Sequence, residues 1–231
     1  MKVIILAGGK GTRLSEYTQS IPKPMVKIGG KPIIQHIIDY YYKYNFNDFI
    51  IAAGYKHSII SQYFKKKKLK KIKIQVVNTG LNSLTGTRLK KLRNYLTKTF
   101  MVTYGDGLSD INLNKLIKFH KINKKKITVT AVHPPARFGE LQIKGNLVDR
   151  FKEKPQLQKG WINGGFFVME PSFLSFIGND NVMLERNPIN KAVKQKMLAA
   201  YKHNKFWYCM DTLRDKKSLE NMIKKNKAPW L

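Results

Sequence analysis

The chain has 231 residues, of which 42% are hydrophobic and 11% aromatic, and this length and composition fit one domain with a single core. No apolar run approaches the roughly 20 residues that a membrane-spanning helix requires, and the single cysteine, Cys209, excludes an internal disulfide and favours a cytoplasmic protein. The formal net charge of +30 leaves open a protein that binds polyanions.

Strand-length apolar runs alternate with helix-length amphipathic segments through the first two thirds of the sequence. The predicted strands are Lys2–Leu6, Phe49–Ala53, Ile72–Asn78, Phe100–Tyr104 and Ile127–Val132. The predicted helices are Pro32–Asn45, Thr87–Leu96 and Leu113–Lys121. This alternation predicts an α/β fold with a doubly wound, mostly parallel, Rossmann-like sheet and right-handed connections.

The last third of the sequence predicts a small antiparallel lobe added to the same sheet. Its predicted elements are a hairpin of Gly139–Ile143 and Leu147–Phe151, a strand Trp161–Met169, a helix that Asn187-Pro188 opens with a cap, a strand Phe206–Met210 and a helix Thr212–Lys225. The spacing of Thr212 and Asp215 is typical of a capping box. No repeat or linker interrupts the chain, so residues 1–231 are predicted to form one domain.

A glycine-rich turn, Leu6-Ala7-Gly8-Gly9-Lys10-Gly11-Thr12-Arg13, follows the first predicted strand. Ligands bind at the carboxyl ends of the strands in doubly wound sheets. Three glycines in four positions let the backbone approach phosphate oxygens and direct its N–H groups at them. The turn is not a Walker A motif, because no Gly-Lys-Ser/Thr ends it, and it is not a dinucleotide fingerprint, because Leu14 stands where the third glycine would be. A tight turn without a ligand explains this segment, taken alone, equally well.

Lys23 lies between two prolines in Pro22-Lys23-Pro24-Met25. Each proline fixes its own φ and restricts the residue before it, which predicts a stiff, extended loop that pre-positions the lysine. Lys23 then supplies a point charge for a phosphate, while the planar guanidinium of Arg13 can bridge phosphate oxygens. The alternative is a surface lysine in a proline-rich loop.

These two segments together resemble the signature of the sugar-nucleotide pyrophosphorylases, and the resemblance covers nearly the whole chain. Further segments, with the ending Lys227-Ala228-Pro229-Trp230, are similar to those of the glucose-1-phosphate cytidylyltransferases. They are Thr79-Gly80-Leu81-Asn82-Ser83-Leu84-Thr85-Gly86-Thr87-Arg88-Leu89, Tyr104-Gly105-Asp106-Gly107, Ile162-Asn163-Gly164-Gly165-Phe166-Phe167 and Met210-Asp211-Thr212-Leu213-Arg214-Asp215-Lys216.

The resemblance implies a magnesium-dependent enzyme that joins CTP to glucose 1-phosphate and releases pyrophosphate, for cell-surface polysaccharide or deoxysugar biosynthesis. It also implies a homo-oligomer with a nucleotide-binding part (1–135) and a sugar-phosphate-binding part (136–231), and neither a specific nucleic-acid partner nor membrane insertion. Uridylyl, thymidylyl or guanylyl transfer is the nearest alternative. A non-catalytic polyanion-binding protein is a remote one, because the basic run Lys65–Lys71 lacks interleaved aromatic residues and favours a solvated loop.

Asp106 and Asp211 follow the predicted strands Phe100–Tyr104 and Phe206–Met210. If both strands end at the same edge of the sheet, the two carboxylates face the phosphate site, and Mg²⁺ is commonly held by one or two carboxylates plus substrate phosphates. The alternative is that Asp106 shapes a turn and Asp211 only caps the last helix, and for Asp211 the residues alone favour this alternative. The resemblance favours metal binding for both.

The resemblance also implies roles for the remaining site residues. Catalytic roles are implied for Arg13, Lys23 and Asp106. Nucleotide contacts are implied for Leu6, Ala7, Gly8, Gly9, Gly11, Thr12, Arg13, Lys23, Thr79, Ser83, Gly86, Arg88 and Gly105, with Gly86 leaving room for the base. Sugar-phosphate contacts are implied for Glu153, Lys154, Asn163, Gly164 and Glu185.

Overall fold

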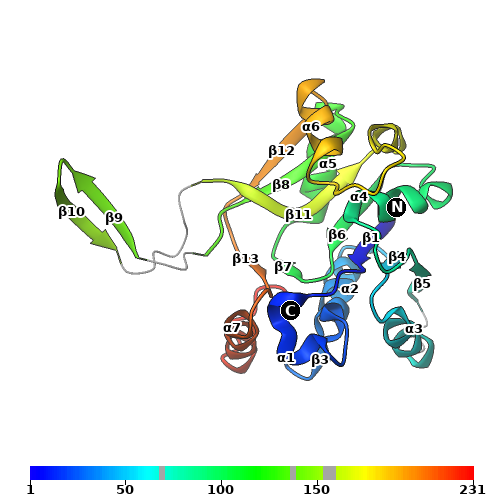
Figure 1. The fold of residues 1–231 in the computed structure, drawn as a ribbon, viewed down its shortest axis with the longest axis horizontal. Helices are drawn as coiled ribbons and strands as arrows, with labels where there is room; N and C mark the ends of the chain where they lie inside the picture. Colours follow the sequence, from blue (N-terminus) through cyan, green and yellow to red (C-terminus); the bar gives the residue numbers. More distant parts are fainter. Residues whose placement is uncertain (68–70, 136–138, 153–159) are drawn as a thin grey trace.

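A seven-stranded sheet forms the centre of the protein in a computed structural model that describes residues 1–67, 71–135, 139–152 and 160–231 (Figure 1). The order across the sheet is β12-β8-β11-β6-β1-β4-β5. Along the chain these strands are β1 (Lys2–Ala7), β4 (Asp48–Ala53), β5 (Lys73–Asn78), β6 (Phe100–Tyr104), β8 (Ile127–Val132), β11 (Ile162–Met169) and β12 (Leu198–His203). Neighbouring strands are parallel except where β11 pairs with β6 and β8. The predicted doubly wound, mostly parallel α/β sheet is therefore confirmed.

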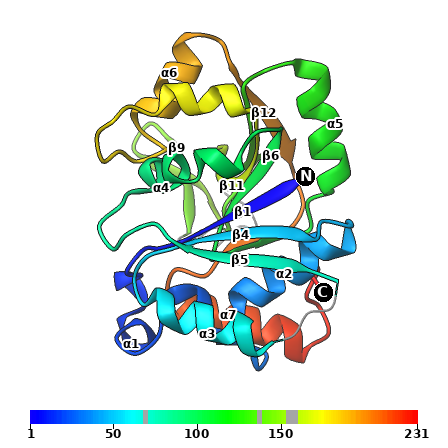
Figure 2. The same ribbon diagram turned by 90° about the vertical axis from the view of Figure 1, so that its right-hand side faces the viewer.

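Helices cover both faces of this sheet and bury a separate core on each (Figure 2). Successive side chains of a strand point to opposite faces, so Val3 and Ile5 of β1 enter one core while Ile4 and Leu6 enter the other. The helices are α1 (Ser15–Thr18), α2 (Ile33–Lys43), α3 (His57–Lys66), α4 (Thr85–Lys91), α5 (Leu113–Asn123), α6 (Asn187–Lys194) and α7 (Leu213–Lys224). Within the described ranges, none of them is both long and apolar enough to cross a lipid bilayer.

Shorter elements complete the fold. The 3-10 turns are η1 (Thr12–Leu14), η2 (Lys23–Met25), η3 (Arg93–Tyr95) and η4 (Pro171–Phe176). The short antiparallel pairs are β2 (Lys27–Ile28) with β3 (Lys31–Pro32), β7 (Gly107–Ser109) with β13 (Trp207–Cys209), and β9 (Glu140–Lys144) with β10 (Leu147–Lys152).

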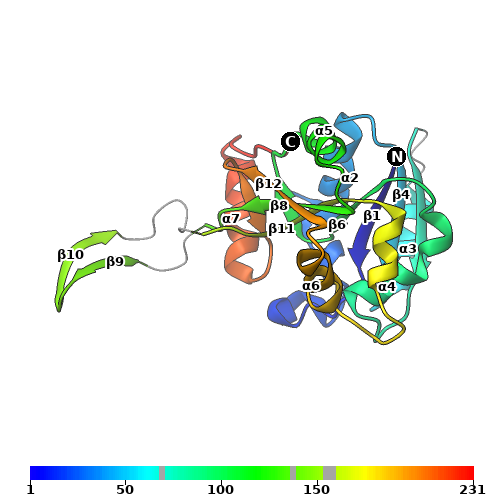
Figure 3. The same ribbon diagram turned by 90° about the horizontal axis from the view of Figure 1, so that it is seen from above.

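The hairpin of β9 and β10 extends away from the body of the molecule (Figures 1 and 3). Ile143 pairs with Val148 and Leu141 pairs with Phe151, so these four apolar side chains share one face of the hairpin. Each of them is more than half exposed, from 54% to 63%. The hairpin therefore presents an uncovered apolar face, defined by these four residues.

Several predicted bounds are wrong. The helix predicted over Thr87–Leu96 is α4, which starts at Thr85 and ends at Lys91, before η3. The backbone N–H groups of Gly86 and Thr87 both donate to the carbonyl of Val182. A contact with a distant loop thus fixes the first turn of α4, and hydrophobic periodicity does not register such contacts.

Of the two N-terminal caps predicted for the last two helices, one is wrong and one is confirmed. The predicted cap at Asn187 is wrong, because Asn187 is the first residue of α6 and Arg186 precedes it without a side-chain capping bond. The capping box at the start of α7 is confirmed: Thr212 Oγ1 accepts from the N–H of Asp215, and the Asp215 carboxylate accepts from the N–H of Thr212.

Several elements have no counterpart among the predicted ones, α3 and β12 among them, and another was placed wrongly. The helix α3 and the edge strand β12 were not predicted, and Lys65 and Lys66 end α3 instead of lying in a loop. The strand predicted at Phe206–Met210 is the shorter β13, which pairs with β7 and does not join the large sheet.

Candidate functional site

A cavity of about 460 Å³ opens where β1 and β6 end. The N–H of Gly105 donates to the carbonyl of Leu6 at 3.1 Å, which joins the turns that follow these two strands. The predicted site residues that line the cavity are Leu6, Ala7, Gly8, Gly9, Gly11, Arg13, Lys23, Ser83, Arg88, Gly105, Asp106, Asn163 and Asp211. The glycine-rich turn, the segment after Thr79 and the two acids thus meet in one place.

Other predicted site residues lie elsewhere. Those placed outside the cavity lining are Thr12, Thr79, Gly86, Gly164 and Glu185. Glu153 and Lys154 fall outside the described residues, so their expected contacts with a sugar phosphate stay predictions.

Asp106 and Asp211 lie side by side, but not for the reason that the sequence suggested. The strand before Asp211 is not part of the large sheet, and its residue Cys209 pairs instead with Gly107, directly after Asp106. The N–H of Met210 donates to the carbonyl of Asp106 at 2.9 Å. The short antiparallel ladder of β7 and β13 therefore brings the two acids together.

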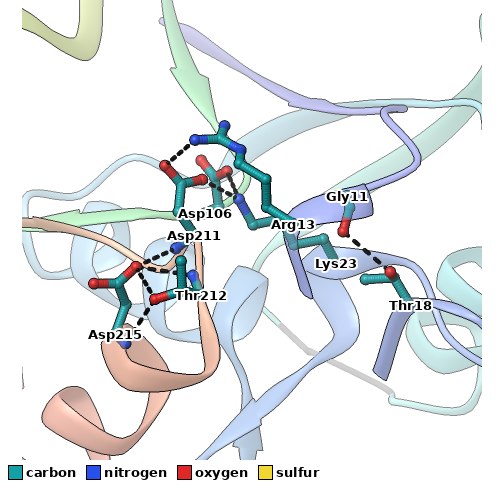
Figure 4. A network of polar contacts seen from close by, with 8 residues as sticks. All are labelled: Gly11, Arg13, Thr18, Lys23, Asp106, Asp211, Thr212 and Asp215. Carbon is teal, nitrogen blue, oxygen red and sulfur yellow. Dashed lines mark hydrogen bonds and ion pairs between the residues drawn. The ribbon is translucent and has the colours of Figure 1, made fainter. Parts of the chain in front are cut away.

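The ammonium group of Lys23 lies between these two carboxylates (Figure 4). Its Nζ is 2.6 Å from Asp106 Oδ2 and 2.6 Å from Asp211 Oδ1. Burial by itself would lower the pKa of Lys23, but the charge of Asp106 and hydrogen bonds to both acids outweigh it and raise that pKa. Burial likewise favours a higher pKa for Asp211, and the hydrogen bond and charge of Lys23 reverse this, so its pKa is lowered.

Lys23 reaches this position from a 3-10 turn, not from the extended loop that its flanking prolines suggested. Pro22 is extended, and the turn begins at Lys23. Gly11 has a φ of +67°, and a Cβ there would lie 2.9 Å from the Cβ of Lys23. The glycine-rich turn thus passes directly over the stem of the lysine, where a side chain at position 11 does not fit.

Arg13 completes the charged network from the solvent side. Its Nη1 donates to Asp211 Oδ2 at 2.7 Å, while its side chain is 70% exposed. The Asp215 carboxylate holds the other side of Asp211, because it accepts from the backbone N–H of Asp211 at 3.1 Å (Figure 4). The capping box of α7 therefore also fixes the acid that precedes it.

Arg88 has a more structural position than its predicted contact with a nucleotide suggested. Its side chain is buried, and its guanidinium donates to five acceptors from two loops and the end of a strand. The acceptors are the carbonyl oxygens of Gly8, Ala53, Gly80 and Leu81 and the hydroxyl of Thr79. Burial lowers the pKa of Arg88, since desolvation disfavours its charged form.

Two glycines make room for protein groups. A Cβ on Gly8 would lie 2.1 Å from the guanidinium carbon of Arg88, so Gly8 admits this arginine. A Cβ on Gly86 would lie 2.9 Å from the carbonyl oxygen of Val182. At Gly86 the missing side chain makes room for the loop before α6, and the expected contact of Gly86 with a base stays a prediction.

A second polar chain crosses the far wall of the cavity. The hydroxyl of Tyr104 donates to Glu185 Oε1, and the hydroxyl of Thr85 donates to Glu185 Oε2 at 2.7 Å. The amide of Asn163 reaches the hydroxyl of Tyr104 at 3.5 Å. Burial, reinforced by the charge of Glu185, raises the pKa of Tyr104 and keeps its phenol protonated.

Several lining residues were not singled out from the sequence. They are Pro24, Leu84, Thr85, Tyr104, Met183, Trp207 and Cys209. Tyr104 and Cys209 each lie within two residues of a predicted acid, and Tyr104 also begins the segment Tyr104-Gly105-Asp106-Gly107 that carries the resemblance. Trp207 donates its indole N–H to the carbonyl of Gly164, a contact between segments 43 residues apart that has no sequence signature.

The acid pair has the chemistry of a cation site. Oxygens of Asp106 and Asp211 and the sulfur of Cys209 all lie within 4.8 Å of one another. The ammonium of Lys23 already occupies the position between the carboxylates. Two carboxylates that line a cavity are a donor set that Mg²⁺ uses together with substrate phosphates.

Comparison with known proteins agrees with this geometry. Residues 2–214 match the family model described as nucleotidyl transferase. The chain is 44% identical to the glucose-1-phosphate cytidylyltransferase of Salmonella typhimurium, over 100% of this chain and 98% of that one. It is 37% identical to the probable glucose-1-phosphate cytidylyltransferase of Bacillus subtilis, over 100% and 99%.

The fold is shared as well. The crystal structure of HddC from Yersinia pseudotuberculosis in complex with GMP-PN superposes with a TM-score of 0.77 at 24% identity, covering 96% of this chain and 99% of that one. The family assignment rests on three findings: a glycine-rich turn, an acid pair bridged by a lysine, and similarity to known relatives over the full chain. The chain belongs to the nucleotidyl transferase family.

Proposed function

We propose that the protein transfers the cytidylyl group of CTP to glucose 1-phosphate and releases pyrophosphate. The observation that carries this proposal is the cluster of Lys23, Asp106 and Asp211 in the same cavity as the glycine-rich turn. The choice of CTP and glucose 1-phosphate follows from relatives with that activity that match over the full chain.

The residues fit a displacement at the α-phosphorus of the nucleotide. A sugar phosphate oxygen is already anionic at neutral pH, so it forms the new P–O bond without a protein base while the bond to pyrophosphate breaks. Catalysis then consists of positioning and charge neutralisation. Backbone N–H groups of Gly8, Gly9 and Gly11 suit the triphosphate, Arg13 the departing pyrophosphate and Lys23 the α-phosphate.

Asp106 and Asp211 would hold Mg²⁺, which supplies positive charge to the triphosphate when bound. For Lys23 to reach a phosphate, its ammonium must leave the acid pair, and its flexible four-carbon stem allows this movement. The exposed side chain of Arg13 is equally free to turn from Asp211 toward a ligand.

The sugar is expected on the side of Asn163 and Glu185. Tyr104 and Thr85 hold the carboxylate of Glu185 beside the cavity, which suits the binding of sugar hydroxyl groups. Arg88 acts on the nucleotide side by fixing the loop after Thr79. The division into a nucleotide part (1–135) and a sugar-phosphate part (136–231), and a location in the cytoplasm, remain predictions.

A homo-oligomer is also proposed, and the apolar face of the projecting hairpin supports it. A two-stranded hairpin is marginally stable by itself in water, and contiguous apolar surface marks an interaction site. A second copy of the chain is the simplest cover, since most oligomers join identical chains. Sedimentation of Leu141→Ser/Phe151→Ser beside the wild type tests this: a smaller assembly is expected, and an unchanged one would contradict it.

Pyrophosphate release with each of CTP, UTP, dTTP and GTP, paired with several sugar 1-phosphates, tests the activity. We expect the highest kcat/KM with CTP and glucose 1-phosphate, and a loss of at least about a hundredfold in Asp106→Asn. Faster turnover with another pair would replace the proposed substrates. No turnover with any pair, together with salt-sensitive retention on RNA, would favour the polyanion-binding alternative.

A further inference from the structure

Cys209 is a metal-binding type of side chain that the proposed reaction does not use, although it faces the cavity. Its place is fixed by the backbone, because Cys209 pairs with Gly107 in the ladder of β7 and β13. Its Sγ and one carboxylate oxygen each from Asp106 and Asp211 lie within 4.8 Å of one another. The three donors come from both sides of one ladder and converge on one point.

A second observation shows that this point favours a cation. The ammonium of Lys23 stands 2.6 Å from an oxygen of each acid and is largely buried there. It occupies the position of a cation between the two carboxylates, and it is the end of a flexible side chain. A metal ion entering the site displaces this group and leaves the backbone unchanged.

The chemistry of the donor atoms decides which ion binds more tightly because of Cys209. Carboxylates and water suit Mg²⁺, whereas a thiolate selects softer ions such as Zn²⁺. Donor atoms around one tetrahedral zinc ion lie about 3.5 Å apart. Side-chain rotations that move the three donor atoms by roughly 1 Å therefore bring them to the spacing that zinc requires. On binding, the thiol proton is released to solvent as the S–metal bond forms.

We propose that Asp106, Cys209 and Asp211 form a binding site for a thiophilic divalent cation, Zn²⁺ in particular. Binding of this ion takes up the acid pair and so excludes Mg²⁺ from it. The binding of Zn²⁺ stands on the three donors alone, while the exclusion of Mg²⁺ rests on the proposed function. The protein is therefore inhibited by zinc at the position of its own activating metal.

Titration with Cd²⁺ tests the site directly, because a cadmium–thiolate bond absorbs in the ultraviolet and Cys209 is the only cysteine. We expect a band that saturates at one Cd²⁺ per chain, that Zn²⁺ removes, and that Cys209→Ser lacks. Calorimetry should show at least about tenfold weaker Zn²⁺ binding in Cys209→Ser, as expected for the loss of a ligand. Excess Mg²⁺ should weaken the apparent affinity for Cd²⁺.

Equal Zn²⁺ affinity in the wild type and Cys209→Ser would overturn the proposal, and so would a cadmium band that neither excess Mg²⁺ nor Asp106→Asn weakens. Circular dichroism of each variant checks its folding, and the competition by Mg²⁺ needs no variant at all. The two proposals fail separately. Turnover with Mg²⁺ but no cadmium band refutes this site alone, whereas the band without any turnover refutes the proposed reaction alone.

Discussion

Replacing Arg88 by lysine tests whether this residue joins the loops of the site or only touches a ligand. The guanidinium donates five hydrogen bonds of 2.7 to 3.2 Å to protein acceptors. An ammonium has three N–H donors and no planar fork, so at least two acceptors lose their partner. Hydrogen bonds to charged groups are worth about 1.5–3 kcal/mol each, which predicts a loss of at least about 3 kcal/mol.

Thermal unfolding measures this loss. For a chain of this size 1 kcal/mol corresponds to about 2–4 °C, so the Tm of Arg88→Lys should fall by about 6–12 °C. Arg93→Lys is the matched control, because Arg93 lies in the next turn and is exposed. The KM for CTP should rise in Arg88→Lys as well, since the loop after Thr79 loses its connection to Gly8.

A Tm of Arg88→Lys equal to that of Arg93→Lys would refute the argument. The close contact with Gly8 provides a second test of the same reasoning. Gly8→Ala should destabilise the wild type, because the new methyl group would overlap the guanidinium, and should cost much less in an Arg88→Ala background. Additive effects of the two substitutions would show that the guanidinium does not fill this space in solution.

Four further predictions concern Asp211, Lys23, the last helix and the far wall of the cavity. The pKa of Asp211 is below its ordinary 3.8, so the stability that Asp211 contributes is present above pH 3.8 and is lost as the pH falls below it. Asp211→Asn should therefore flatten the acid side of a plot of Tm against pH. The raised pKa of Lys23 makes its contribution complete below pH 10.5 and lost above it, which the alkaline side should show. Thr212→Ala should cost about 1 kcal/mol in chemical denaturation, as the loss of an N-cap does. Tyr104→Phe removes one of the two hydrogen bonds that hold the Glu185 carboxylate. It should raise the KM for glucose 1-phosphate by up to about tenfold, equivalent to one hydrogen bond, without changing the KM for CTP.

Much of the fold follows from local patterns in the sequence. Strands β6 and β8 have the predicted bounds, because both are short apolar runs with clear ends. The unpredicted helix α3 has Ile60 as its one fully buried side chain, and its other apolar side chains, Ile59, Tyr63 and Phe64, are only partly buried against the core. Strand β12 is an edge strand with partly exposed residues, and its pairing with β8 depends on a partner some 70 residues away.

The site was harder to predict than the fold, because its contacts join distant segments. The motifs identified Lys23, Asp106 and Asp211, yet the reasoning that brought the acids together named the wrong sheet. Arg88 illustrates the limit most clearly. A motif marks it as important, but only the positions of its acceptors show that it binds the protein's own carbonyl groups.

The cationic side chains of the cavity have two different roles, because Arg88 pairs with neutral groups whereas Lys23 and Arg13 pair with carboxylates. Arg88 faces neutral carbonyl groups that stay in place whether or not a ligand is bound, so it holds the nucleotide side rigid. Lys23 and Arg13 pair with carboxylates that can instead bind a metal ion, so a metal ion can replace these two side chains. Loading of a metal would free both cations at the moment when anionic phosphates arrive to bind them. The acid pair thus couples the binding of metal to the binding of nucleotide. Zinc, as proposed, would bind the acid pair in the absence of nucleotide, displace Lys23 and Arg13 in the same way, and so prevent Mg²⁺ from binding there.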